Sequence, residues 1–388
     1  MIFLKNRVFV TFLGVAICML LAQDSFAQKI RDLFDKEMPQ FERLSDEEFE
    51  ELTFYHKDIP FGDQALAYEV RLPMDWSEPK ERSISNMSLS SHLLGEIVTF
   101  YSPPRTEFER SKFQIKALRL DFETTAEQWL LRNILANGFT LEGLEYFDEN
   151  KVGALHVYLD GGDTYVSRSL AQINGKRMIL VEFIVPAENW EQEAPLIARS
   201  METFKLLSPE RNINIENMET HVFLDIAQFS YPESWKISTR AIRSVDKMEV
   251  SLNNFRHGDR TVLDGQIKVE LVAAYIVQNL ENEIESVKSE FRRKGLVINN
   301  FLESREDHDF SPEAEFGFLD VFTANDPNNS RFEYEVWIAV MAIQNHYVIV
   351  SMFTPGRDYD FFTWSRNAST FRSVTTSTKM QVRSISID

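Results

Sequence analysis

The sequence predicts an α+β fold with two tandem α-β-α sandwich domains, each an antiparallel sheet flanked by helices. Three duplicated features lead to this prediction: a strand that ends at a Pro-x-x-Trp motif, a long apolar strand that follows a tight turn, and a helix that ends at Thr-Phe. They occur in the same order in both halves of the 388-residue chain. A repeat of this length indicates that each copy is a layered unit with its own core.

The first duplicated feature is the strand before Pro-x-x-Trp. Residues 67–76 and 226–235 each alternate apolar and polar side chains up to a proline, the period-two pattern of a half-buried strand. Proline ends a strand because it cannot donate a hydrogen bond to a sheet ladder. We expect Trp76 and Trp235, three residues after each proline, to close one end of a core rather than to line a ligand groove.

The second duplicated feature is a nearly continuous apolar run. Residues 178–186 and 347–355 are rich in β-branched and apolar side chains, which is typical of central strands covered on both faces. Asn174-Gly175 precedes the first run and Gln344-Asn345 precedes the second. Both dipeptides favour a tight hairpin turn.

Each copy is expected to contain two helices. The closing helices are predicted over 191–199 and 359–366, before the Thr-Phe pairs that end in Phe204 and Phe371. For the central helices, Thr125 and Asn279 are expected as N-caps, with Gly138 and Gly295 at the C-terminal ends. The side chains expected on the inner faces are Ala126, Trp129, Leu130, Asn133 and Ile134 in the first copy, and Ile284, Val287 and Phe291 in the second.

The repeats divide the chain into segments. The predicted segments are a signal peptide at 1–27, a helical N-terminal extension at 28–61, repeat 1 at 62–208, a linker at 209–219, repeat 2 at 220–375 and a flexible tail at 376–388. In the extension, Ser45 to Glu48 form a capping-box pattern. We expect Phe49 and Leu52 to pack that short helix onto the first domain.

The N-terminus has the three parts of an export signal. Lys5 and Arg7 precede an apolar run at 8–22, and small residues at Ser25 and Ala27 predict cleavage before Gln28. Fifteen helical residues span about 22 Å, less than the roughly 30 Å of a bilayer core. A retained N-terminal anchor is the alternative. A lipoprotein signal is disfavoured because apolar Ile17 precedes Cys18 and apolar residues follow it.

Cleavage would remove the one cysteine of the chain. Secreted eukaryotic proteins of this size usually carry disulfides, so their absence favours the periplasm of a Gram-negative bacterium. No other apolar run is long enough to span a membrane, and we therefore expect no integral span after cleavage.

The composition is acidic, with 60 Asp and Glu against 41 Lys and Arg and a formal net charge of −19. Such a field repels nucleic acids and anionic lipid headgroups, and it is compatible with basic partners or cations. A hydrophobic content of 44% is that of a folded chain rather than a disordered one.

The sequence contains no catalytic motif that we could assign. None of the seven histidines has zinc-ligand spacing, and nucleophile-elbow, phosphate-loop and dinucleotide patterns are absent from the sequence. We therefore expect no cofactor. Two acidic turns offer weak candidate metal ligands, Asp160 with Asp163 and, in the second copy, Asp326. The alternative is that both turns are ordinary hairpins made of residues that tolerate unusual dihedral angles.

The two copies resemble the PsbP-like superfamily (PsbP/DcrB-type domains). The resemblance rests on Pro73-x-x-Trp76 with Thr203-Phe204, and on Pro232-x-x-Trp235 with Thr370-Phe371. It covers roughly residues 62–208 and 220–375. It implies an antiparallel sheet between helices, and a role as an assembly or binding module without catalysis.

These observations favour a non-enzymatic periplasmic binding or scaffold and assembly protein of the bacterial cell envelope, whose partner is another envelope protein. The alternative is a cation- or small-molecule-binding protein, or a hydrolase, with its site in a cleft between the two domains. The sequence indicates no oligomeric state.

Overall fold

The computed structural model describes residues 30–79, 95–104, 110–210, 213–239, 244–256, 258–306 and 309–381. The predicted signal peptide, Cys18 and the cleavage point before Gln28 lie outside these ranges. The chain divides into two compact units, Met1–Lys36 and Glu37–Asp388. In the first unit, helix α2 spans Ile30–Phe34. No helix among the described residues is long and apolar enough to cross a membrane.

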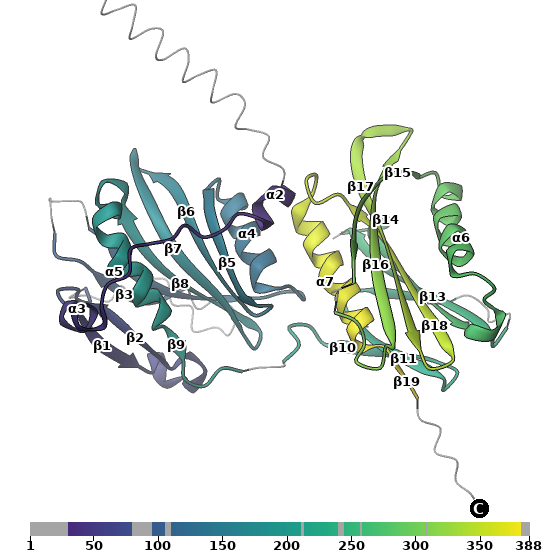
Figure 1. Cartoon of the computed structure of the whole chain (residues 1–388), viewed down its shortest axis with the longest axis horizontal. Coiled ribbons are helices and arrows are strands. Elements are labelled where there is room, and N and C mark those ends of the chain that lie inside the picture. The colour runs from purple at the N-terminus through teal and green to yellow at the C-terminus, as the bar shows by residue number, and fades with distance from the viewer. Residues whose placement is uncertain are drawn as a thin grey trace, which may run out of the picture. The chain divides into compact units, whose positions relative to one another are not determined.

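In the second unit, a first assembly contains one large and one small antiparallel sheet (Figure 1). The large sheet has the order β3 (Glu96–Tyr101), β4 (Lys112–Arg119), β8 (Arg177–Pro186), β7 (Asp163–Asn174), β6 (Lys151–Asp160), β5 (Thr140–Asp148). The small sheet has the order β1 (Thr53–Asp58), β2 (Tyr68–Pro73), β9 (Lys205–Leu206). Helix α5 (Trp190–Glu202) contacts β2, β7 and β8, and α4 (Ala126–Ala136) contacts β5, β6 and β7.

A second assembly in the same unit has a corresponding strand order. Its large sheet has the order β12 (Lys236–Thr239), β13 (Lys247–Arg256), β14 (Asp259–Ala273), β18 (His346–Pro355), β17 (Asn329–Ile343), β16 (Phe316–Asp326), β15 (Val297–Arg305). Its small sheet has the order β10 (Met218–Phe223), β11 (Ala227–Pro232), β19 (Lys379–Met380). Helix α7 (Phe361–Ser377) contacts β11, β14 and β18, and α6 (Leu280–Arg293) contacts β15. The many antiparallel strands and fewer helices confirm the α+β class.

The predicted strands and turns are present. Strands β2 and β11 end at the predicted prolines, and β8 and β18 have a paired strand on each side. Gly175 and Gln344 adopt positive φ angles of 59° and 52° in the two hairpin turns. The left-handed backbone that such turns need explains why Asn-Gly and Gln-Asn occur there.

The predicted ends of the central helices are also present. The second closing helix does not end at Thr370-Phe371 as predicted, because α7 continues to Ser377 with Val374 still buried. The side chains of Thr125 and Asn279 each accept a hydrogen bond from a backbone N–H of the first turn of their helix. Gly138 and Gly295 follow the helices with φ angles of 70° and 95°. Ser45 begins α3 (Asp46–Leu52) with the predicted capping box.

The inner faces of the central helices are confirmed in most positions. In α4 the buried side chains are Ala126, Leu130, Leu131 and Ile134, whereas Trp129 and Asn133 are half-buried. In α6, Val287 and Phe291 are buried and Ile284 is half-buried. Leu131 was missed because a helix that covers three strands buries a wider stripe than the predicted face.

The structure also differs from the sequence-based expectations at four other places. Residues 53–58 of the predicted helical extension form β1, because their side chains alternate in burial against β2. Phe49 is buried, but Leu52 is 47% exposed. Strand β10 begins inside the predicted linker at Met218. Residues 376–380 of the predicted flexible tail complete α7 and form β19 on β11.

An N-terminal strap, residues 37–45, crosses the first assembly before α3 (Figure 1). Glu37 forms a parallel bridge with Leu144 of β5. The neighbouring Gly143 must be glycine, because a Cβ there would lie 2.8 Å from Met38 Cα. At the other end, Arg199 Nη1 donates a hydrogen bond to the carbonyl oxygen of Ser45 at 2.6 Å.

Candidate functional site

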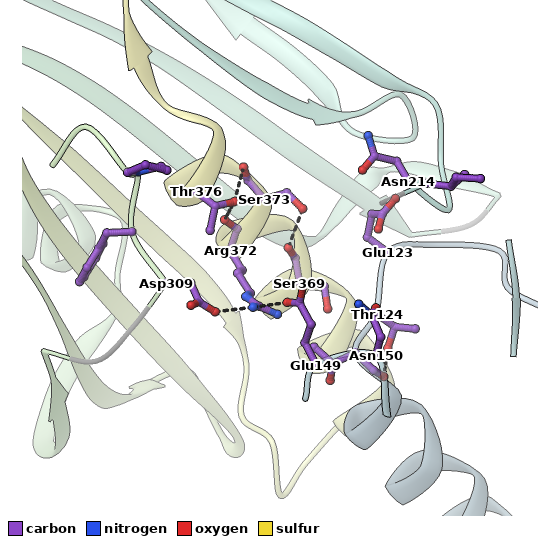
Figure 2. A pocket seen from close by; sticks show the side chains of 14 residues that line it. Glu123, Thr124, Glu149, Asn150, Asn214, Asp309, Ser369, Arg372, Ser373 and Thr376 are labelled. Atoms are coloured by element: carbon purple, nitrogen blue, oxygen red, sulfur yellow. Dashed lines mark hydrogen bonds and ion pairs between the residues drawn. The ribbon is translucent and has the colours of Figure 1, made fainter. Parts of the chain in front are cut away.

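The candidate functional site is a half-open cavity of about 550 Å³, which we call the polar pocket (Figure 2). Its lining comes from five separate segments of the chain. The lining residues are Glu123, Thr124, Thr125, Glu149, Asn150, Ile213, Asn214, Asp309, Phe310, Pro312, Ser369, Arg372, Ser373 and Thr376.

Helix α7 supplies one wall of the polar pocket. Ser369, Arg372, Ser373 and Thr376 are spaced three and four residues apart, which places them on one face of the helix. Figure 2 shows these side chains on one side of the helix, with Arg372 extending toward Asp309 and Glu149. The helix therefore presents three hydroxyl groups and one guanidinium to the cavity.

Carboxylates outnumber cations in the polar pocket. Arg372 forms ion pairs with Glu149 and with Asp309. Glu123 lies on another wall, where its Oε1 accepts a hydrogen bond from the backbone N–H of Glu216 at 2.9 Å. Burial raises the pKa of Glu123, and the nearby charge of Glu216 raises it further. With one cation against three carboxylates, the lining is suited to a cationic group that also accepts and donates hydrogen bonds.

The predicted metal ligands lie outside the polar pocket. Asp160 and Asp163 pair with each other at the β6–β7 hairpin, whose Gly161 and Gly162 have positive φ angles. Asp326 is in the β16–β17 hairpin, where its Oδ1 accepts a hydrogen bond from the Asn328 backbone N–H at 2.8 Å. The structure does not bring the two turns together. Among the described residues, no three His, Cys, Asp or Glu side chains gather to hold a metal.

Trp76 and Trp235 lie in the hydrophobic cores, as expected. Trp76 is 8% exposed and its ring meets that of Phe183 at a centroid distance of 5.7 Å. Trp235 is 1% exposed. Neither residue lines the polar pocket.

Sequence reasoning missed the polar pocket because its residues form no local motif. The available signal was the hydroxyl-rich stripe at Ser369, Ser373 and Thr376 on a helix expected to be apolar on its inner side. That stripe indicates that a second face of the helix contacts polar groups. The sequence could not identify those groups, because Glu123 and Asp309 are far from the stripe along the chain.

A charged cluster under α6 fixes that helix to its sheet. Lys268 is 8% exposed, and its Nζ lies 2.8 Å from Glu249, 3.1 Å from Glu270 and 2.6 Å from Glu290. Burial alone would raise the pKa of Glu290, but Lys268 and Lys294 lower it to about 2. Because these charges are paired with one another, we interpret the cluster as structural.

His156 of β6 is a buried histidine with an unusual setting. It is 1% exposed, and neither ring nitrogen has a hydrogen-bond partner among the described residues. Phe139 stacks on the imidazole at 5.3 Å. Burial lowers the pKa of His156 to about 4, with Glu182 opposing and Lys116 adding to the effect.

No family model matches the sequence. No curated protein matches it either. Among solved structures, the chain is similar to cyanobacterial PsbP from Synechocystis sp. PCC 6803, with 14% identity over 39% of this chain and 91% of that chain and a TM-score of 0.29. It is also similar to the Ran-binding protein Mog1p of Saccharomyces cerevisiae, with 10% identity over 42% and 95% of the two chains and a TM-score of 0.31. The T6SS immunity protein TplEi of Pseudomonas aeruginosa matches 85% of this chain and 97% of its own, with 10% identity and a TM-score of 0.22. These are loose resemblances of fold.

Proposed function

We propose that the protein is a non-enzymatic, exported binding protein of the bacterial cell envelope, whose partner is a protein with a basic surface. The observation that carries this proposal is the polar pocket, where three carboxylates face one arginine that is already paired. A Lys or Arg side chain of a partner would complete the charge balance there.

The proposal includes a tandem of two PsbP-like units. It is supported by the matching strand orders β3-β4-β8-β7-β6-β5 and β13-β14-β18-β17-β16-β15. In both assemblies a central helix connects the second strand of these series to the last one (β4 to β5 and β14 to β15), and a closing helix follows the third (β8 and β18). The matched positions of Trp76 and Trp235 after β2 and β11 support the same duplication.

The distribution of charge also favours a basic partner. Arg168, Lys268 and Arg357 are buried and form ion pairs with carboxylates of their own assembly. The excess of 60 acidic over 41 basic side chains is therefore carried mainly by exposed groups. Such a field increases the association rate with a positively charged partner and makes binding sensitive to salt.

The experiment is capture of partners after cross-linking in the periplasm, with purification of the tagged full-length chain. We expect one reproducible basic protein, with capture that falls as the salt concentration rises. The test variant combines Glu149→Gln and Asp309→Asn, which removes two charges from the polar pocket. The matched control combines Asp160→Asn and Asp163→Asn, which removes two charges from a hairpin outside it.

We expect the pocket variant to reduce capture at least tenfold and the control to stay within about twofold of the native chain. Equal effects of the two variants would show that the pocket has no special part in binding. Absence of any reproducible protein partner would reject the proposed function itself.

A second candidate is a small organic cation in the polar pocket. The specific observation is the oxygen-rich lining of a cavity of about 550 Å³, which lies within the usual size range of small-molecule sites. A thermal-shift screen with polyamines and other small organic cations tests it, because a ligand that binds the native state raises Tm. If a tenfold excess of these ligands leaves Tm unchanged, this candidate is rejected.

A further inference from the structure

The first assembly contains a second half-open cavity, of about 330 Å³, which we call the strap cavity. The N-terminal strap forms one wall, α5 forms another, and β5 and β7 form the floor. The lining residues are Met38, Pro39, Gln40, Phe41, Glu42, Arg43, Glu145, Arg168, Pro195, Ala198, Arg199 and Glu202. None of them belongs to the polar pocket.

A buried arginine forms the floor of the strap cavity. Arg168 of β7 is 5% exposed, and its guanidinium crosses β6 to form an ion pair with Glu145 of β5. Its Nη1 donates a hydrogen bond to the Ala154 carbonyl oxygen at 3.3 Å. Its Nε–H has no partner among the described residues. The Nε atom is itself buried and cannot reach a ligand in the cavity. Arg168 lines the cavity, and its two Nη groups have more N–H donors than the bonds to Glu145 and Ala154 use, so a ligand can accept one of the remaining N–H groups.

Gly153 makes this position of Arg168 possible. A Cβ at residue 153 would lie 2.7 Å from Arg168 Nη1, closer than two such atoms can approach. Any larger residue at position 153 would displace the guanidinium. The glycine thus leaves the room that the arginine side chain occupies.

The second assembly fills the corresponding volume with side chains. Tyr165 of β7 pairs with Pro186, and Tyr334 of β17 pairs with the equivalent Pro355. Arg168 and Trp337, each three residues after the tyrosine, therefore occupy equivalent positions in the two sheets. Trp337 is buried, and its ring meets that of Trp364 at 5.9 Å. The first assembly has an arginine above a glycine at this position, whereas the second assembly has packed indole rings. This difference indicates that the strap cavity is a specific feature of the first assembly.

The charges around the strap cavity are balanced. Three cations, Arg43, Arg168 and Arg199, face three carboxylates, Glu42, Glu145 and Glu202. The small side chain of Ala198 and the ring of Pro195 leave an apolar section of wall between them. A ligand with a single charge would meet as much repulsion as attraction, whereas a ligand with both charges can satisfy both signs.

We propose that the strap cavity binds a zwitterionic ligand of the size of an α-amino acid or a dipeptide. The carboxylate accepts an N–H of the Arg168 Nη groups, and the ammonium group lies toward Glu202 at the exposed end of α5. The apolar wall at Ala198 receives the side chain. A volume of about 330 Å³ is at the small end of the range for ligand sites, which suits such a molecule.

The experiment is calorimetric titration of the purified full chain with L-leucine and glycyl-L-leucine. N-acetyl-L-leucine lacks the ammonium group and L-leucinamide lacks the carboxylate, so they serve as matched probes. We expect at least one zwitterion to bind, and each single-charge probe to bind at least tenfold more weakly. Ligand should also slow tryptic cleavage after the exposed Arg43, because the strap is one wall of the site.

Two variants of α5 separate a role in binding from a role in stability. Glu202→Gln removes the exposed carboxylate at the cavity, and Glu191→Gln makes the same change on the same helix away from it. We expect Glu202→Gln to weaken binding of the zwitterion at least tenfold and Glu191→Gln to leave it unchanged. The proposal is overturned if neither zwitterion binds at millimolar concentration, if the single-charge probes bind equally well, or if the two variants behave alike.

Discussion

The buried carboxylate of Glu335 in β17 is the position where a single atom exchange should be most destabilising. Glu335 is 2% exposed and its partner Arg357 is 4% exposed. Its oxygens accept hydrogen bonds from Trp337 Nε1 and Trp364 Nε1, both at 2.8 Å, and from Arg357 Nε at 2.9 Å. The change Glu335→Gln keeps the shape of the side chain and removes its charge.

The magnitude follows from what the change leaves behind. Glutamine has one acceptor oxygen, and its NH₂ group would face donors that glutamate accepted, so at least one of the buried N–H groups loses its partner. The guanidinium of Arg357 keeps Glu303 at 3.1 Å but loses its main counter-charge. Breaking a buried ion pair in this way costs about 3–5 kcal/mol. If the second assembly of about 150 residues unfolds cooperatively, this corresponds to a fall in Tm of roughly 6–20 °C.

Thermal and urea unfolding followed by circular dichroism measure this prediction. The matched control is Glu333→Gln, two residues away on the same strand, where the side chain is exposed. We expect the control to change the free energy of unfolding by less than about 0.5 kcal/mol. If Glu335→Gln lowers the free energy of unfolding by less than 1 kcal/mol, the hydrogen bonds and ion pair of this carboxylate do not stabilise the fold as argued.

Three further changes should have measurable effects. The native chain should lose stability as pH falls from 6.5 to about 4, because only its unfolded state protonates the His156 imidazole in that range. His156→Phe should remove this loss, which is on the order of 3 kcal/mol. Urea unfolding at several pH values measures the pH dependence of the free energy of unfolding. Glu290→Gln should lower Tm at neutral pH, and the difference should vanish as pH falls from 4.5 to about 2, because a carboxylate with a lowered pKa stabilises the fold only while ionised. Gly143→Ala should displace the strap, whose Met38 Cα would lie 2.8 Å from the new Cβ, and should accelerate tryptic cleavage after Arg43.

Each of these three expectations has a clear contrary result. An unchanged pH slope in His156→Phe would mean that other groups control the acid sensitivity. A Tm difference in Glu290→Gln that persists at pH 2 would assign the effect to packing rather than to charge. Unchanged cleavage in Gly143→Ala would show that the strap adapts to the added methyl group.

The local elements of the fold were predictable from the sequence because each has a local physical cause. The side chains of Ser45, Thr125 and Asn279 cap helices through hydrogen bonds within one turn of the chain. Prolines end β2 and β11 because the ladder lacks a donor there. Strand β1 was missed because its burial pattern depends on pairing with β2, ten residues further along the chain. The capping box at Ser45 also favoured a helical interpretation of the whole extension.

The candidate sites were not predictable, because long-range pairing creates them. In the polar pocket, Arg372 meets Glu149 and Asp309, which belong to separate segments of the chain. In the strap cavity, Arg168 reaches Glu145 only because β6 places Gly153 between them. The acidic turns at Asp160 and Asp326 were candidate metal sites because of their local composition. In the structure both are hairpin turns between paired strands.

Comparison of corresponding positions in the two assemblies separates stability from binding. Val166 and Arg168 of β7 occupy the register positions that Glu335 and Trp337 occupy in β17. In the second assembly the buried charge is surrounded by donors, so its removal should lower stability while any ligand of the strap cavity still binds. In the first assembly the buried arginine lines a cavity, so changes at the rim of that cavity, such as Glu202→Gln, should reduce binding with little effect on Tm. If Glu335→Gln and Glu202→Gln each altered both Tm and ligand binding, stability and binding would not be divided between the two assemblies. The difference between Arg168 and Trp337 would then be a difference of packing alone.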